Sequence, residues 1–339
     1  MIPAGLVIPA GVVLPAGLVV PAGKVLDGVL EASVVGSFSS IGLSVRSRLL
    51  PEFAAGQQPR PGRVAVVTGA TSGLGLATAV ELARQGMSVH FLARDRTKAA
   101  RARRLIEAAS RDGGAVTFGL ADLAELDSVR GFAADFLASH GSLDVLIHNA
   151  GALSEQYRAS KAGIELTVAG QVLAPFLLTQ LLLPALTAAA PSRVITVSSG
   201  GMYAQRLDPG TLVMPADTYN GVTAYARAKR AQVLLSREWA RRLAGTGVAF
   251  HSMHPGWAST PGVISSLPRF HQLMKPILRS PEQGADTIVW LATAPAAQLG
   301  SGRFWHDRRP RSEYWFPWTR EASGTAGQLW EWAAEQTAS

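Results

Sequence analysis

Residues 63–75 read RVAVVTGATSGLG, a β-branched run followed by a loop with three glycines. Between a strand and a helix, such a loop lets the backbone approach a pyrophosphate and presents the free N–H groups of the helix N-terminus. The glycine spacing alone also fits an ordinary strand–helix turn, but its position after the first strand favours phosphate binding. The residues predicted to bind a dinucleotide here are Thr68, Gly69, Thr71, Ser72, Gly73, Leu74 and Gly75.

Short apolar runs alternate with helical stretches downstream of this loop. Strand–helix alternation predicts an α/β fold: a Rossmann-like doubly wound parallel sheet with helices on both faces. Ligands of such sheets bind beyond the carboxyl ends of the strands, so the residues after each run are candidate ligands. The runs are SVHFLA, AVTFGL, LDVLIHN, RVITVS and GVAFHSM, with helices predicted at about 73–86, 97–111, 125–140, 161–189 and 225–244.

Composition excludes several classes of protein. The chain has 339 residues, 47% hydrophobic and 17% charged, which excludes global disorder. It has no cysteine, which excludes disulfides and cysteine-ligated metal sites. The seven histidines are scattered except for His251 and His254, so no metal is expected. The net charge is +8, but no basic run is interleaved with aromatic residues, so no nucleic-acid partner is expected.

Residues 1–61 precede the regular pattern and begin with a six-residue repeat, IPAGLV, IPAGVV, LPAGLV, VPAGKV. Its prolines break any spanning helix, and no basic segment precedes it as in a signal peptide, so no stable membrane span is expected. We predict a low-complexity leader, disordered or partly helical around Ile41–Leu50, with a membrane tether as the alternative. Residues 62–310 are predicted to form the nucleotide-binding domain, and residues 311–339 an aromatic-rich extension.

The end of the second strand bears on the choice of dinucleotide. It reads FLARDR, so Arg94 follows the strand and can meet a ribose 2′-phosphate with a bidentate contact, to which Ser72 could add a hydroxyl. A carboxylate at a strand end would instead bind the 2′-hydroxyl, and Asp95 keeps that alternative open. The sequence therefore favours NADP(H) over NAD(H).

A serine, a tyrosine and a lysine follow in an order that suits carbonyl chemistry. The run RVITV ends at Ser198 and Ser199, and Tyr225 and Lys229 occupy positions i and i+4 of a predicted helix. They therefore project from one face, where a cation lowers the pKa of a phenol that must give and take a proton. An exposed helix pair is the alternative for Tyr-x-x-x-Lys alone. Ser199 is preferred to Ser198 as the residue that holds the substrate oxygen.

These motifs, in this order, resemble the short-chain dehydrogenase/reductase superfamily over about residues 62–262, and further stretches resemble its subgroup of dehydrogenase/reductase SDR family member 12. The resemblance implies an oxidoreductase that interconverts a carbonyl and an alcohol, with Tyr225 and Lys229 also touching the cofactor. It implies further cofactor contacts from Asp122, Leu123, Asn149, Ala150, Gly151, Pro255, Gly256 and Thr260.

One position departs from the superfamily pattern. Gln171 stands where the superfamily places a catalytic asparagine, so the resemblance implies a weakened proton-relay role for it. Pro175 predicts a kink in the same helix. This departure motivates a second hypothesis, a nucleotide-binding sensor or interaction protein with little turnover.

The substrate side is less defined by sequence. Residues 261–282 are expected to form an apolar lid, which favours a lipophilic carbonyl or alcohol, although the same residues could simply pack onto the domain. The tryptophans near the C-terminus are expected to pack onto the protein itself. The long helices at 161–189 and 225–244 could form a homo-oligomer seam, and we expect a cytoplasmic protein.

Overall fold

The computed structural model describes residues 12–13, 19–20, 22–54, 58–266 and 268–338. Most of the six-residue repeat lies outside the described residues, so the expectation of a low-complexity tail is not addressed there. Within the repeat, β1 (Val12–Val13) pairs antiparallel with β2 (Val19–Val20).

An eight-stranded sheet in the order β10-β9-β8-β7-β6-β3-β4-β5 forms the centre of the molecule. All neighbours are parallel except β10, which is antiparallel to β9. The central strands are apolar because helices cover both faces, as the alternation predicts. The strands are β3 (Val64–Thr68), β4 (Ser88–Ala93), β5 (Val116–Leu120), β6 (Val145–His148), β7 (Ser192–Val197), β8 (Val248–Met253), β9 (Arg303–His306) and β10 (Arg309–Pro310).

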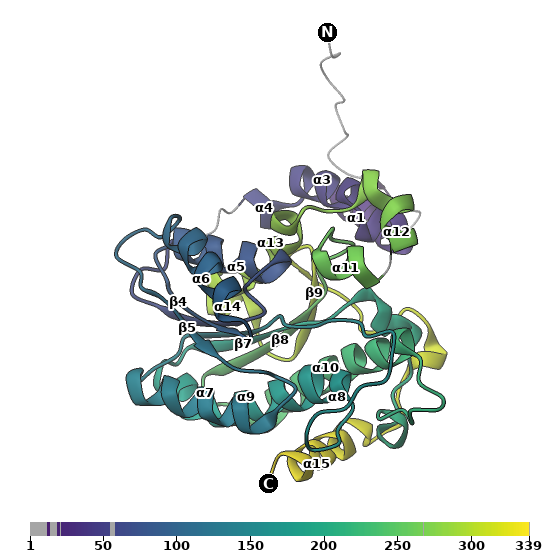
Figure 1. Cartoon of the computed structure of the whole chain (residues 1–339). Coiled ribbons are helices and arrows are strands. Elements are labelled where there is room, and N and C mark those ends of the chain that lie inside the picture. Colours follow the sequence, from purple (N-terminus) through teal and green to yellow (C-terminus); the bar gives the residue numbers. More distant parts are fainter. Residues whose placement is uncertain (1–11, 14–18, 21, 55–57, 267, 339) are drawn as a thin grey trace.

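Helices pack on both faces of the sheet and make two separate cores (Figure 1). One face carries α5 (Gly73–Arg84), α6 (Arg96–Glu107) and α13 (Pro281–Thr293). The other carries α7 (Leu126–Ser139), α9 (Ala174–Ala188) and α10 (Gly221–Arg242). The predicted doubly wound α/β fold is confirmed. The strands β9 and β10 and the helix α13 extend it beyond the predicted elements.

The strand order reverses between β3 and β6, and this places the site. The chain winds outward from β3 through β4 and β5, then returns to the other side of β3 as β6. At such a switch point the loops after the two strands diverge and leave a crevice. The glycine loop after β3 and Asn149 after β6 therefore border the same crevice.

The helix predicted at 161–189 is interrupted. It begins as α8 (Leu166–Val168), continues as a π-helical turn η1 (Ala169–Leu173) and only then becomes α9. The irregular turn lies directly before Pro175, whose missing N–H breaks the regular hydrogen-bond ladder. The kink expected from Pro175 is thus a π-helical turn that contains Gln171.

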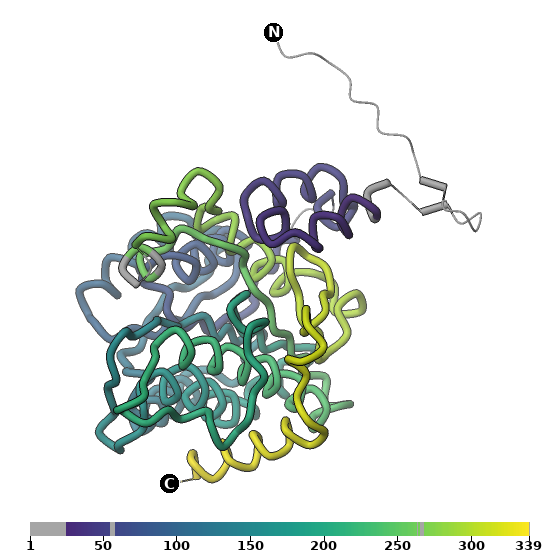
Figure 2. The backbone as a smooth tube through the Cα atoms, turned by 90° about the vertical axis from the view of Figure 1, so that its right-hand side faces the viewer, coloured from purple at the N-terminus to yellow at the C-terminus, as the bar shows by residue number. Residues whose placement is uncertain are grey.

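The described part of the N-terminal leader includes four short helices, which lie against the domain near α13 and β9 (Figures 1 and 2). The helix expected around Ile41–Leu50 corresponds to α3 (Ser40–Leu49). Its Arg46 is fully buried and pairs with Asp27 and Asp307, which lies between β9 and β10. The other leader helices are α1 (Ala22–Ala32), α2 (Val34–Phe38) and α4 (Pro51–Ala54).

The C-terminal aromatic residues mostly contact the protein itself. On α15 (Thr325–Thr337), Trp330 packs against Phe176 and Trp239, and Trp315 stacks on Phe38. Phe316 and Trp318 stack on each other and are exposed, with 42% and 71% of their surfaces accessible. The remaining short elements are α11 (Pro261–Ser266), α12 (Pro268–Met274), α14 (Ala296–Leu299), η2 (Gly200–Ala204), η3 (Pro209–Thr211), η4 (Lys275–Ile277) and η5 (Pro317–Thr319).

One helix of the described chain is long and apolar enough to cross a membrane. It is the 23-residue stretch Leu166–Ala188, and about two thirds of its most apolar window is buried in the fold. Its side chains form part of the core beneath the sheet, and core helices of this kind satisfy the same length and composition test.

Candidate active site

The glycine loop and the start of α5 form one wall of a cavity of about 530 Å³. Gly69 adopts φ +70°, and a Cβ on Gly75 would lie 2.3 Å from the Gly69 carbonyl oxygen. Only glycine permits this close approach of loop to helix. The α5 N-terminus therefore opens into the cavity with its N–H groups available to an anion.

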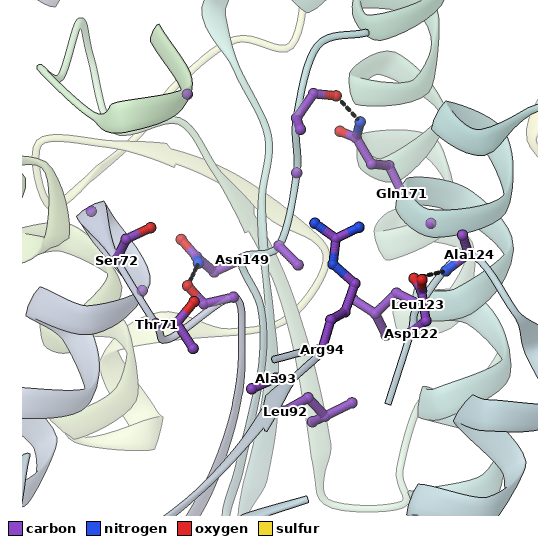
Figure 3. A pocket seen from close by; sticks show the side chains of 18 of the residues that line it. Thr71, Ser72, Leu92, Ala93, Arg94, Asp122, Leu123, Ala124, Asn149 and Gln171 are labelled. Atoms are coloured by element: carbon purple, nitrogen blue, oxygen red, sulfur yellow. Dashed lines mark hydrogen bonds between the residues drawn. The ribbon is translucent and has the colours of Figure 1, made fainter. Parts of the chain in front are cut away.

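Thr68 and Asn149 brace this loop. The buried Thr68 hydroxyl accepts hydrogen bonds from the backbone N–H groups of Asn149 and Ala150, both at 3.0 Å. The Asn149 Nδ2 donates to the Thr68 carbonyl oxygen at 2.9 Å and to the Gly69 carbonyl oxygen at 3.4 Å, and the second bond joins residues that line the cavity (Figure 3). Thr68 does not line the cavity, although Asn149 does. The Thr68 hydroxyl therefore fixes the crevice from behind rather than facing a ligand.

Arg94 lines the cavity at the end of β4, and Figure 3 shows its side chain extending into that space. The neighbouring Asp95 is the N-cap of α6, where its Oδ1 accepts a hydrogen bond from the Lys98 N–H at 2.8 Å. Ser72 is the N-cap of α5, but its hydroxyl makes no capping hydrogen bond with that helix. The arginine and the serine are thus presented to a ligand while the carboxylate is used locally.

Asp122 and Leu123 line the cavity after β5. The Asp122 Oδ1 accepts a hydrogen bond from the Ala124 N–H at 3.0 Å, which holds the loop in a tight turn (Figure 3). Asp122 thus forms a turn at the place where a cofactor contact is expected.

Ser199, Tyr225 and Lys229 come together at the carboxyl end of β7. Ser199 lies just after β7. The Lys229 Nζ donates to the Val197 carbonyl oxygen at the end of that strand, and the Tyr225 ring centroid lies 5.4 Å from the Nζ. Ser198 is turned away, because its hydroxyl donates to the Lys229 carbonyl oxygen at 2.8 Å. The phenol of Tyr225 and the amine of Lys229 therefore lie together near the strand end that is followed by Ser199.

The electrostatics of the pair follow from burial. Burial lowers the pKa of Lys229 to about 7, and 2% of this residue is exposed. Burial also raises the pKa of Tyr225 above its ordinary value, while the hydrogen bond from Ser199 opposes that rise. Removing the lysine charge would therefore make the phenol a still weaker acid.

Gly151 connects this triad to the cavity. A Cβ at this position would lie 3.0 Å from the Lys229 Nζ and 2.9 Å from the Gln171 Oε1, so both side chains lie over the Gly151 backbone. The Gln171 Nε2 donates to the Ala152 carbonyl oxygen at 2.7 Å (Figure 3). Its Oε1 is buried and has no partner among the described residues. A buried acceptor without a partner at a cavity wall is suited to a ligand hydroxyl or amide.

The segment from His254 to Thr260 reaches the cavity at its last residue. Thr260 lines the cavity, whereas Pro255 and Gly256 do not. Gly256 has φ +76°, and a Cβ there would lie 2.5 Å from the Arg279 guanidinium. Arg279 donates to the Pro255 carbonyl oxygen at 3.1 Å and therefore holds the turn in place.

Sequence reasoning did not identify the buried charges behind this segment. Asp307 pairs with Arg279 and with Arg46. One ionic cluster therefore joins the leader, the predicted lid segment 261–282 and the turn between β9 and β10. Burial alone raises the pKa of Asp307, but His306 and the two arginines hold it well below its usual range. The stretch FWHDRR was visible as a charged, aromatic run, but nothing local identifies its partners.

The predicted residues divide into two sets. The cavity lining contains the glycine-loop residues other than Thr68, and Arg94, Asp122, Leu123, Asn149, Ala150, Gly151, Gln171 and Thr260. Ser199, Tyr225 and Lys229 lie outside that lining, joined to it at Gly151. The described residues contain no group of three or more side chains suited to hold a metal ion. The glycine approach, the open helix N-terminus and the unpartnered Gln171 oxygen fit a dinucleotide.

Comparison with known proteins agrees with this geometry. The family model for short chain dehydrogenase matches residues 63–268. Dehydrogenase/reductase SDR family member 12 from Bos taurus is 40% identical over 78% of this chain and 83% of its own length. Retinol dehydrogenase 11 from Mus musculus is 36% identical over 73% of this chain and 78% of its own length.

Solved structures share the fold. An uncharacterised protein from Mycobacterium Paratuberculosis superimposes with a TM-score of 0.68 at 31% identity, over 84% of this chain and 97% of the other. The RhlG/NADP active-site complex from Pseudomonas aeruginosa gives a TM-score of 0.59 at 26% identity, over 72% and 94% of the two chains. The chain therefore belongs to the short-chain dehydrogenase/reductase family and is an NAD(P)-dependent oxidoreductase acting on alcohols or carbonyls.

Proposed function

We propose that this protein reduces a lipophilic carbonyl with NADPH, or oxidises the corresponding alcohol with NADP⁺. The observation that carries the proposal is that the Lys229 Nζ lies both beside the Tyr225 ring and over Gly151, which lines the cavity. The roles of Tyr225, Ser199 and Lys229 in proton transfer are derived from this arrangement below. The cytoplasmic location expected from the sequence remains a prediction.

The preference for NADP(H) is supported by three neighbouring residues. Arg94 presents a guanidinium to the cavity, Ser72 has a hydroxyl that its own helix does not use, and Asp95 is engaged as a helix cap. A bidentate arginine contact suits a 2′-phosphate, whereas a 2′-hydroxyl needs an available carboxylate. The NADP named for the Pseudomonas aeruginosa complex is consistent with this preference.

The lipophilic character of the substrate is supported by the residues around the lid. Trp257 and Phe270 pack edge to face, with ring centroids 5.4 Å apart, and Phe38 lies against Trp257. On the helices α11 and α12, Ile264 and Leu273 are exposed. The similarity to a retinol dehydrogenase also favours an apolar alcohol or aldehyde.

Each catalytic side chain has one task. When bound, the nicotinamide supplies or accepts the hydride. In the reductive direction Tyr225 donates its hydroxyl proton to the substrate oxygen, which Ser199 holds by a hydrogen bond. The Lys229 ammonium stabilises the phenolate that remains, until a proton from solvent restores the phenol.

A panel of apolar aldehydes and ketones tests this function, with NADPH oxidation followed at 25 °C. We expect turnover on at least one member, and a loss of about 100-fold or more in Tyr225→Phe, because positioned acid–base catalysis contributes on that order. Tyr225→Phe should still bind NADPH, since the glycine loop and Arg94 are unchanged. Tight NADPH binding with turnover no faster than in Tyr225→Phe would instead support the sensor hypothesis that Gln171 motivates.

A further inference from the structure

The Gln171 carbonyl oxygen cannot accept the regular α-helical hydrogen bond within its own helix. In a regular α-helix it would accept a hydrogen bond from the N–H four residues later, but that residue is Pro175, which has none. The preceding π-helical turn does not repair the gap, because its last bond runs from the Ala174 N–H to the Ala169 carbonyl oxygen. A buried carbonyl at this point needs a donor from elsewhere.

Gln232 supplies that donor from the neighbouring helix α10. Its Nε2 donates to the Gln171 carbonyl oxygen at 2.7 Å, and its Oε1 accepts from the Lys229 Nζ at 3.2 Å. Gln232 is 3% exposed, so water does not compete at either end. The amide has one orientation: a flip would place its NH₂ against the lysine donor and its oxygen against the carbonyl.

The lysine is consequently held at two points. Its Nζ donates to the Val197 carbonyl oxygen at 2.9 Å as well as to Gln232. An ammonium has three N–H bonds, so one is left for the Gly151 side, where the Nζ approaches the backbone. Without Gln232, the long lysine side chain would keep a single protein acceptor and could rotate away from Tyr225.

We propose that Gln232 is a positioning residue, which ties Lys229 to the Gln171 carbonyl and so fixes the lysine beside Tyr225. This inference rests on the proposed acid–base role of Tyr225 and Lys229. Gln232 itself does not line the cavity that contains Gly151 and Gln171. It acts through the lysine, and Pro175 is the reason why a side chain is needed at that carbonyl.

The groups that face Lys229 define what a titration would report. Tyr225 faces it from the same helix, and β7 contributes the Val197 carbonyl. The loop after β6 contributes Gly151, and the π-helical turn contributes the amide of Gln171. Because Gln232 accepts from the charged form, removing that acceptor lowers the lysine pKa, and replacing it by a carboxylate raises the pKa.

The test uses the full chain with NADPH bound, labelled with ¹³C at the lysine ε carbon. The chain has five lysines, so the Lys229 signal can be assigned from Lys229→Arg. Gln232→Met keeps the volume but has no strong acceptor, and we expect its Lys229 pKa to fall by roughly one unit. Gln232→Glu should shift the same pKa upward. Gln328→Met, on the exposed surface of α15, is the matched control and should leave it unchanged.

Activity gives the second readout. In Gln232→Met, kcat should fall roughly 3- to 10-fold while the substrate KM stays within about twofold, because the lysine acts on the phenol rather than on substrate binding. Opposite pKa shifts in the two variants would not arise from a purely structural role. The titration needs no substrate, so it also stands if no carbonyl is turned over. An unchanged Lys229 pKa in both Gln232 variants would overturn the proposal.

Discussion

At the scale of single residues, cofactor choice depends on which side chains have been used by the fold. Asp95 was the sequence-level argument against NADP(H), and its carboxylate caps α6. Arg94, one residue earlier, lines the cavity. To bind a ribose hydroxyl, the Asp95 carboxylate would first have to give up its hydrogen bond with the Lys98 N–H, at a cost of about 1 kcal/mol.

Arg94→Glu should therefore discriminate between the two dinucleotides. We expect the NADPH dissociation constant to rise about tenfold or more, because a charge-assisted contact becomes a repulsion. The NADH dissociation constant should change far less, since NADH carries no 2′-phosphate. Both are measurable by fluorescence titration.

Arg101→Glu is the matched control for this change, because it alters the charge equally on the exposed surface of α6 and outside the cavity. Equal losses of NADPH affinity in the two variants would show that the effect comes from the change in net charge and not from a contact made by Arg94. An NADPH affinity unchanged in Arg94→Glu would refute the assignment of this arginine.

The residues that line the cavity on the cofactor side could be predicted from the sequence because they directly follow strands. Gly69, Arg94 and Asn149 each lie at the end of a periodic run, and the ends of parallel strands share one edge. Gln232 was not predictable in the same way. Its role arises only when Pro175 on one helix and Lys229 on another are brought together, and no local pattern encodes that meeting.

At the scale of secondary-structure elements, the central strands could be predicted from local sequence, whereas the strands at one edge of the sheet could not. The strands β3 to β8 were predictable because each is an apolar run with a helix beside it. The strand β9 has four residues with an exposed arginine at its start, so it resembles a turn in sequence. The helix α3 is tied to the domain by Arg46 and Asp307, which are 261 residues apart.

The leader helices also contact the segment that leads to Thr260 at the cavity, a role that a low-complexity tail would not have. The Trp257 N–H donates to the Phe38 carbonyl oxygen at 2.8 Å, so α2 helps to hold the segment before Thr260. The Phe38 ring also packs closely against Gly200, the first residue of η2: a Cβ on Gly200 would lie 2.9 Å from the ring. Displacing α2 should therefore affect the substrate side more than the glycine loop.

Arg46→Met tests this coupling. Arg46 is fully buried against Asp27 and Asp307, and breaking such a pair typically costs about 3–5 kcal/mol because it leaves buried carboxylates less compensated. We expect the urea midpoint to fall accordingly and the substrate KM to rise, with NADPH affinity retained. The exposed Arg48 on the same helix gives the control variant Arg48→Met. Loss of NADPH affinity together with substrate affinity would show a global rather than a local effect.

At the scale of the whole molecule, distant ends of the chain are joined over one edge of the sheet. Asp27 accepts from Arg309 and Arg311, and Arg46 reaches Asp307. Burial alone raises the pKa of Asp27, but hydrogen bonds and charges from these arginines hold it well below its usual range. The cluster therefore stays ionised at any pH near neutrality, and carboxylate protonation does not weaken it until strongly acid conditions.

Buried histidines make the fold sensitive to milder acid. Burial lowers the pKa of His148 and of His251 to about 3, and that of His306 to about 4. The unfolded chain binds these protons near pH 6.5, whereas the folded chain excludes them. Between pH 6.5 and about 4 the unfolded state therefore binds more protons, and stability falls as the pH falls.

We expect the free energy of unfolding to drop by roughly 2 kcal/mol per buried histidine between pH 7.5 and pH 5, measured by urea denaturation with NADPH absent. In His148→Gln the slope should be shallower by one histidine's share, although its stability at pH 7.5 should be lower because the Thr179 hydrogen bond is altered. The measurement stops at pH 5 so that the paired carboxylates do not contribute. A free energy of unfolding that is constant from pH 7.5 to pH 5 would contradict the burial of these rings.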